Sequence, residues 1–116
     1  MFIFPKYNIH GPEVRLAGFV LGQGNGNRAI GCTARGVYGG KDSSGFHWPE
    51  GTDGLWEFSD FESYDNNHGI FVWQNTNFDH VVERGVIRDC KRAGIAHGAY
   101  ANHYLYRDVD ISNVPI

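Results

Sequence analysis

Three carboxylates have the residue type and spacing that glycosidic chemistry needs: Asp60, Glu62 and Asp110. Two periods of about 25 residues separate Asp60 from Asp110, with Gly85 midway. In a stack of coils about 4.8 Å apart, the two aspartates would share one outer face at about 9.6 Å. Glu62 would lie about 7 Å from Asp60 along the same strand. The wider separation suits an acid and a base that cleave a sugar linkage with inversion. The competing interpretation is a solvated acidic face.

Two of the six histidines, His68 and His97, are candidates for proton transfer because an unperturbed imidazole titrates near neutral pH. His68 falls in a polar turn and His97 near the end of a short strand. The alternative is that each is a hydrogen-bonded structural residue. None of the histidines shows the His-x-x-x-His or His-x-Glu spacing of a metal site. We therefore expect no metal and no cofactor, and the oxygen ligands are too few to predict calcium.

An outward strip of flat and polar side chains is the candidate substrate-binding surface: Phe71, Trp73, Asn75 and Tyr100. Phe71 and Trp73 point outward if Ile70 and Val72 point inward, because side chains alternate along a strand. Exposed aromatic rings stack on the apolar faces of sugars. His97 is predicted to join this strip. The competing interpretation is that Trp73 packs under the loop at residues 74–79.

A repeat of about two dozen residues positions these candidates. A glycine followed by a large apolar residue recurs at intervals of 27, 24 and 25 residues, as Gly18-Phe19, Gly45-Phe46, Gly69-Ile70 and Gly94-Ile95. A repeat of this length is typical of stacked coils whose equivalent residues form columns. Three columns are predicted: Phe46, Ile70 and Ile95; Val37, Phe61, Val86 and Ile111; and a polar column of Asp53, Asn77 and Asn102.

The repeat predicts an all-β fold, a single-stranded right-handed parallel β-helix of about four coils of 24–27 residues. Residues 1–40 are expected to form an irregular N-terminal coil with a Gly/Asn-rich loop, and residues 41–116 the regular coils of the same structural unit. An antiparallel β fold is the alternative, because it also needs many short strands. The column predicts a further glycine near position 119, so we expect a truncated C-terminus and self-association through an open end.

Composition excludes few functions. A net charge of −3 and a pI near 6.0 argue against nucleic-acid binding, which usually needs a basic face. No stretch reaches the roughly 20 apolar residues of a membrane span. Two cysteines do not make a disulfide framework, and two free thiols are the preferred interpretation over a pair.

Residues 45–113 resemble the β-helix repeats of the pectin-lyase-like superfamily. The segment Ser63-Tyr64-Asp65-Asn66-Asn67-His68-Gly69-Ile70-Phe71-Val72 is similar to the strand, Asn-rich turn and Gly-apolar strand of those repeats, especially in the cell-migration-inducing hyaluronidase and fibrocystin group. The resemblance implies a carbohydrate-binding or polysaccharide-processing protein with an extracellular or cell-surface parent. An activity would be of the polysaccharide lyase, glycoside hydrolase or uronate epimerase type, but no catalytic motif of these enzymes matches. The alternative is a structural shaft, adhesin or phage-fibre segment without activity.

Overall fold

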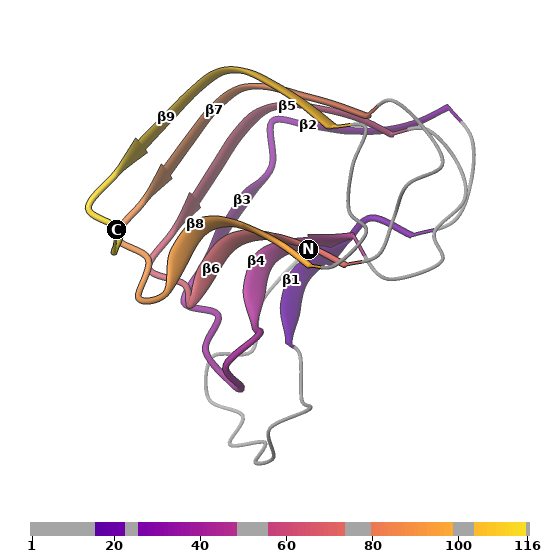
Figure 1. The fold of residues 1–116 in the computed structure, drawn as a ribbon. Coiled ribbons are helices and arrows are strands. Elements are labelled where there is room, and N and C mark those ends of the chain that lie inside the picture. The colour runs from indigo at the N-terminus through magenta and orange to yellow at the C-terminus, as the bar shows by residue number, and fades with distance from the viewer. Residues whose placement is uncertain (1–15, 23–25, 49–55, 74–79, 99–103, 116) are drawn as a thin grey trace.

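The computed structural model describes residues 16–22, 26–48, 56–73, 80–98 and 104–115. These residues contain no helix and form two parallel sheets (Figure 1). One sheet has the order β1-β4-β6-β8 and the other β2-β5-β7-β9, with β3 also pairing with β5. The strands are β1 (Ala17–Val20), β2 (Asn27–Ile30), β3 (Thr33–Arg35), β4 (Ser44–Trp48), β5 (Trp56–Tyr64), β6 (His68–Val72), β7 (His80–Arg88), β8 (Ala93–His97) and β9 (Tyr104–Ser112).

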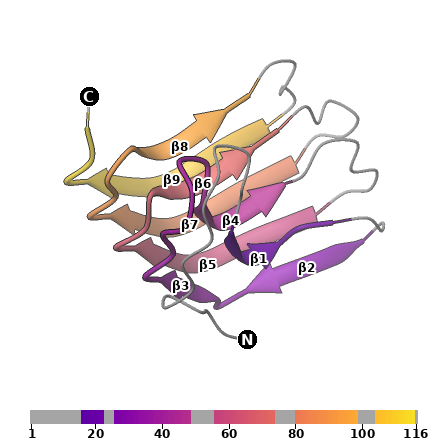
Figure 2. The same cartoon turned by 90° about the horizontal axis from the view of Figure 1, so that it is seen from below.

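The predicted Gly-apolar column is confirmed. Phe46 stands in register with Ile70 and Ile70 with Ile95, and Phe19 extends the column below them. Phe46 and Ile70 are fully buried. The column rises through three turns of chain, and Figure 2 shows the strands of this sheet in that order. The fold is therefore an all-β parallel β-helix.

The second predicted column is wrong by one residue. Phe61 stands in register with Gly85, and Gly85 with Val109. Val86 instead pairs with Glu62 and is 38% exposed. A side chain at position 85 would overlap the ring of Phe61, so only glycine fits beneath that ring. Phe61 thus fills the space of two inward positions.

The other two members of that column also lie elsewhere. Ile111 faces inward, but in register with Ile87, and it is 44% exposed on the last rung. Val37 is buried outside the strands, where its backbone N–H donates to Asn66 Oδ1 at 2.9 Å. The predicted polar column of Asp53, Asn77 and Asn102 lies outside the described residues.

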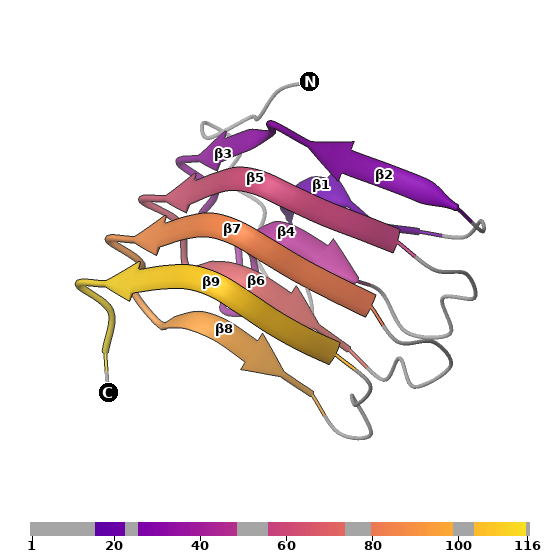
Figure 3. The ribbon, with the colours of Figure 1, turned by 90° about the horizontal axis from the view of Figure 1, so that it is seen from above.

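The long strands bend in the middle, as Figure 3 shows for β5, β7 and β9. The bend falls on left-handed residues of successive rungs, which are Gly31, Asp60, Arg84 and Asp108. A second set of left-handed residues follows the same strands, at Gly36, Asp65, Asp89 and Asn113. Glycine, aspartate and asparagine tolerate positive φ better than other residues do. Each coil therefore turns at two fixed positions, and the bend turns a single long strand into two sides of the helix.

A buried amide ties three rungs of backbone together in the interior. Asn66 is fully buried, and its Nδ2 donates to the carbonyl of Ala34 at 3.2 Å and to Ser63 Oγ at 2.9 Å. Ser63 Oγ in turn donates to the carbonyl of Gly69 at 3.0 Å. Because Asn66 also accepts from Val37, both ends of its amide are satisfied. The aromatic core lies beside this network, with the rings of Phe58 and Phe61 stacked at 4.2 Å.

Candidate functional site

The predicted acid–base pair is not formed as expected. Asp60 is a left-handed bend residue, and its carboxylate binds Arg84 on the next rung at 3.0 Å. Asp110 stands in register with Val86 rather than Gly85, so the residue that shares its line two rungs below is Glu62. The prediction that Asp60 and Asp110 share a column is therefore wrong, and the cause is the same one-residue shift.

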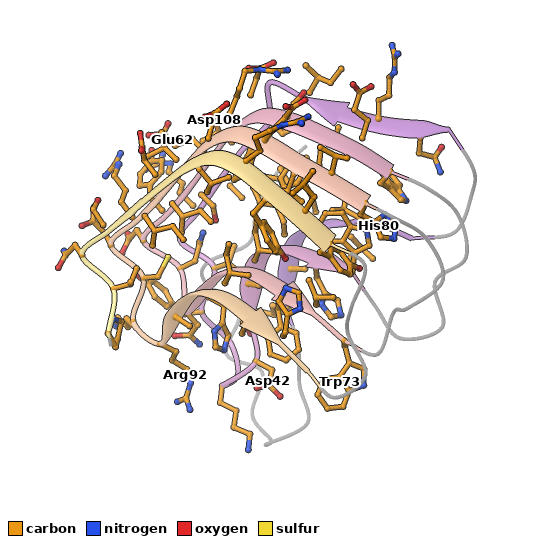
Figure 4. All side chains as sticks on the ribbon, turned by 45° about the horizontal axis from the view of Figure 1, so that its top comes forward. Asp42, Glu62, Trp73, His80, Arg92 and Asp108 are labelled. Carbon is orange, nitrogen blue, oxygen red and sulfur yellow. The ribbon has the colours of Figure 1, made fainter. Side chains whose placement is uncertain are left out.

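Glu62 belongs to an ion-pair ladder on the outer side of the bent sheet (Figure 4). Arg88 binds Glu62 at 3.2 Å and Asp89 at 2.8 Å, and its guanidinium lies over the Tyr64 ring at 4.1 Å. The hydrogen bond from Asn113 and that from Arg88 lower the pKa of Asp89. A carboxylate held in its charged form by such partners suits a structural ladder better than a proton donor.

The two histidine candidates occupy different environments. His68 is buried at the start of β6, and its Nε2 lies 3.0 Å from the carbonyl of Lys41. Burial lowers the pKa of His68. His97 stands in register with Val72, which faces the interior, so it does not belong to the outward strip. It is exposed because it lies on the last rung, and its Nε2 is 2.6 Å from the Tyr106 hydroxyl.

The predicted aromatic strip is not an open surface at Phe71. Phe71 lies beside Ala96, and only 6% of Phe71 is exposed. Its ring stacks on Trp73 at 5.9 Å. Trp73 in turn occupies the space where a side chain at Gly98 would be. Asn75 and Tyr100 lie outside the described residues, so their binding role stays a prediction.

A hollow of about 450 Å³ on the outer face of β2, β5, β7 and β9 is the site that the sequence did not reveal. Its lining residues come from successive rungs: Gly26, Asn27, Arg28, Trp56, Glu57, Val81, Glu83 and Arg107. The Trp56 ring is fixed by a hydrogen bond from Nε1 to the carbonyl of Gly22 at 2.7 Å. The register that assembles the hollow depends on the loops between strands, whose lengths differ from coil to coil.

Two ion pairs frame the hollow. Arg28 binds Glu57 at 2.9 Å, and Arg107 binds Glu83 at 2.9 Å. The Glu83 side chain is the most enclosed of the four, with 16% exposure, because Arg84 also reaches it at 3.2 Å. The hollow therefore offers both cationic donors and anionic acceptors with no net charge, and Val81 adds an apolar side chain to its lining. Such a surface can hydrogen-bond a ligand that carries many hydroxyl groups.

The described part of the chain was compared with the expectations for metal ligands, cysteines and membrane spans. No group of three His, Cys, Asp or Glu side chains there is placed to hold a metal ion. Cys32 and Cys90 are both free, as expected. No helix among these residues has the length and apolar character to cross a membrane. No protein-family model, curated protein or solved structure matches the chain.

Proposed function

We propose that the chain is a carbohydrate-binding segment of a β-helix protein, and that its ligand is an uncharged oligosaccharide held in the hollow. The arrangement of Arg28–Glu57 and Glu83–Arg107 around Val81 is the observation that supports the proposal most. Sugar hydroxyls both donate and accept, so they can bridge a guanidinium and a carboxylate. The zero net charge of the four side chains disfavours a polyanion or polycation, whose charges would meet a like charge in the hollow.

The length of the hollow also fits an extended ligand. Its residues span all rungs from β2 to β9, about 14 Å at the usual strand spacing. The resemblance to the pectin-lyase-like superfamily supports the same orientation, because polysaccharides lie along the stack in proteins of that group. The role is binding rather than catalysis, since both carboxylates of the hollow are engaged by arginines.

Titration of the folded chain with neutral, acidic and basic oligosaccharides tests this proposal. Arg107→Ala should weaken neutral-oligosaccharide binding by about tenfold or more, which corresponds to about 1.4 kcal/mol. Arg88→Ala is the matched control, because Arg88 is also a half-exposed arginine of the bent sheet that pairs with a glutamate, but it lies outside the hollow. An equal loss in both variants, or no binding of any oligosaccharide by the folded protein, contradicts the proposed function.

A structural shaft is the second candidate, favoured by a different observation. Among the described residues, ion pairs join neighbouring rungs of the bent sheet at four places, as Arg28–Glu57, Asp60–Arg84, Glu62–Arg88 and Glu83–Arg107. Such cross-strand pairs stabilise the stack whether or not a ligand is present. If Arg107→Ala and Arg88→Ala both lower the free energy of unfolding and no glycan binds, the shaft is the better account.

A further inference from the structure

The two ion pairs of the hollow differ in how fully their polar atoms are engaged. Both carboxylate oxygens of Glu83 already have partners. Its Oε2 lies 3.0 Å from Arg107 Nε and 2.9 Å from Arg107 Nη2, and its Oε1 lies 3.2 Å from Arg84 Nη1. The Glu83 carboxylate therefore has little capacity left for a ligand, and its contacts hold the Arg107 guanidinium in place.

The Arg28–Glu57 pair is the more open of the two. Its closest contact joins Arg28 Nε to Glu57 Oε1 at 2.9 Å. Within the part of the chain that the structure describes, the two Nη atoms of Arg28 and the Oε2 atom of Glu57 form no hydrogen bond. The two side chains are 69% and 47% exposed, against 16% for Glu83. This pair therefore keeps donors and an acceptor side by side for a ligand.

The register explains why Glu57 stays available. Arg28 on β2 stands in register with Glu57 on β5, and Glu57 with Val81 on β7. Because valine has no polar side-chain group, no donor at position 81 competes for the Glu57 carboxylate. Glu83 differs, since an arginine stands beside it on the next rung and another follows it in its own strand.

We propose that Arg28 and Glu57 set the specificity of the hollow by binding two neighbouring hydroxyl groups of one sugar unit, and that Glu83 is a positioning residue for Arg107. This inference rests on the proposed binding of an uncharged oligosaccharide. One hydroxyl of the pair donates to Glu57 Oε2, and its neighbour accepts from an Nη group of Arg28. Hydrogen bonds to charged groups are stronger than those between neutral groups, so a sugar unit that makes both contacts is preferred over one that makes a single contact.

The substrate class is therefore an oligosaccharide whose internal units keep two adjacent free hydroxyls. Cellohexaose and laminarihexaose test this, because they have the same composition and differ only in linkage. Internal units of cellohexaose keep such a pair, whereas the linkage in laminarihexaose substitutes the hydroxyl between the two that stay free on the ring. Isothermal titration calorimetry with the full chain should show cellohexaose binding about fivefold tighter or more.

Single variants assign the contacts. Arg28→Ala and Glu57→Ala should each weaken cellohexaose binding about tenfold or more and reduce the preference over laminarihexaose. Glu62→Ala is the matched control and should bind as the parent chain does. Glu62 is also a glutamate of β5 that pairs with an arginine on a neighbouring rung, but it lies outside the hollow.

Double variants separate a ligand contact from a positioning role. Glu83→Gln should weaken binding in the parent chain but add little to the loss in Arg107→Ala, because Glu83 acts through Arg107. The losses from Glu57→Ala and Arg107→Ala should instead multiply, because each residue contacts the ligand separately. A Glu83→Gln effect of equal size with and without Arg107 would make Glu83 a ligand contact and overturn its positioning role.

The failure of this inference is distinguishable from failure of the proposed function. Equal affinity for the two hexasaccharides, or parent-like binding by Glu57→Ala, overturns the inference, and the proposed function stands if Arg107→Ala still loses binding. No binding of either hexasaccharide also overturns the inference. The proposed function is lost with it only if every other neutral oligosaccharide fails to bind as well.

Discussion

The contact between Phe61 and Gly85 allows the register to be tested in solution. Gly85→Ala places a methyl group where the Phe61 ring lies. The ring has little room to move, because it is 4% exposed and stacked at 4.2 Å on Phe58. Overpacking of this kind costs about 1–3 kcal/mol. Phe61→Ala should cost about 3–5 kcal/mol, because it leaves a cavity in the core.

The double variant Phe61→Ala/Gly85→Ala tests whether the two side chains are in contact. Without the ring, the Gly85→Ala methyl fills part of the cavity, and alanine is favoured over glycine in a strand by about 0.5–1 kcal/mol. Gly85→Ala should therefore be neutral or stabilising in the Phe61→Ala background, which gives a coupling energy of about 1–3 kcal/mol.

Urea unfolding followed by far-ultraviolet circular dichroism measures all three variants, with Phe61→Leu as a milder replacement where Phe61→Ala does not fold. The control is Val86→Ala, which should cost less than about 1 kcal/mol because Val86 is 38% exposed. Additive effects of the Phe61 and Gly85 changes, together with a large effect of Val86→Ala, would refute this register.

Three further predictions concern the bend, the buried amide and pH. Arg84→Gly should be about 1 kcal/mol more stable than Arg84→Ala in urea unfolding, because Arg84 has φ 55° and both variants lose the same two ion pairs. The control position is Glu62, which has no positive φ, so Glu62→Ala should be more stable than Glu62→Gly. Asn66→Ala should lower the free energy of unfolding by about 2–4 kcal/mol, because it leaves the Val37 N–H and the Ala34 carbonyl without their hydrogen-bond partner. An unchanged urea midpoint would show that water replaces the amide. Burial lowers the pKa of His68, so the unfolded chain takes up the proton first as the pH falls. The contribution of neutral His68 to stability is therefore complete above about pH 6.5 and is lost as the pH falls from there. The urea midpoint of His68→Gln should depend less on pH between 7.5 and 5.5 than that of the parent chain, and an equal dependence would assign the effect to other groups.

The sequence was sufficient to predict the stacked coils, because glycine is needed at the second position of β4, β6 and β8, where the two sheets approach. A side chain at Gly69 would overlap Ile87 on the opposite sheet, and its intervals to Gly45 and Gly94 are therefore preserved. The coil period could be read from this one position. The predicted polar column, and Asn75 and Tyr100 of the predicted outward strip, fall on residues that the structure does not describe.

The error in the second column has a physical cause. The turn between β5 and β6 covers residues 65–67, whereas the turn between β7 and β8 covers residues 89–92. The extra residue lengthens the interval from Gly69 to Gly94 to 25, but the preceding strands β5 and β7 remain 24 residues apart. Applying an interval of 25 to Phe61 therefore points to Val86 instead of Gly85. The period of one sheet does not fix the period of the other when turns differ in length.

This shift also decides the chemistry of the outer face. With an interval of 25, Asp60 and Asp110 would have shared one outer face with Gly85 between them, as the predicted acid–base pair requires. With the observed interval of 24, Asp60 meets Arg84 and Glu83 meets Arg107, so each carboxylate has a guanidinium within 3.0 Å. A carboxylate paired with a guanidinium keeps lone pairs that accept hydrogen bonds from hydroxyl groups. The register is therefore compatible with the proposed binding of a hydroxylated ligand in the hollow.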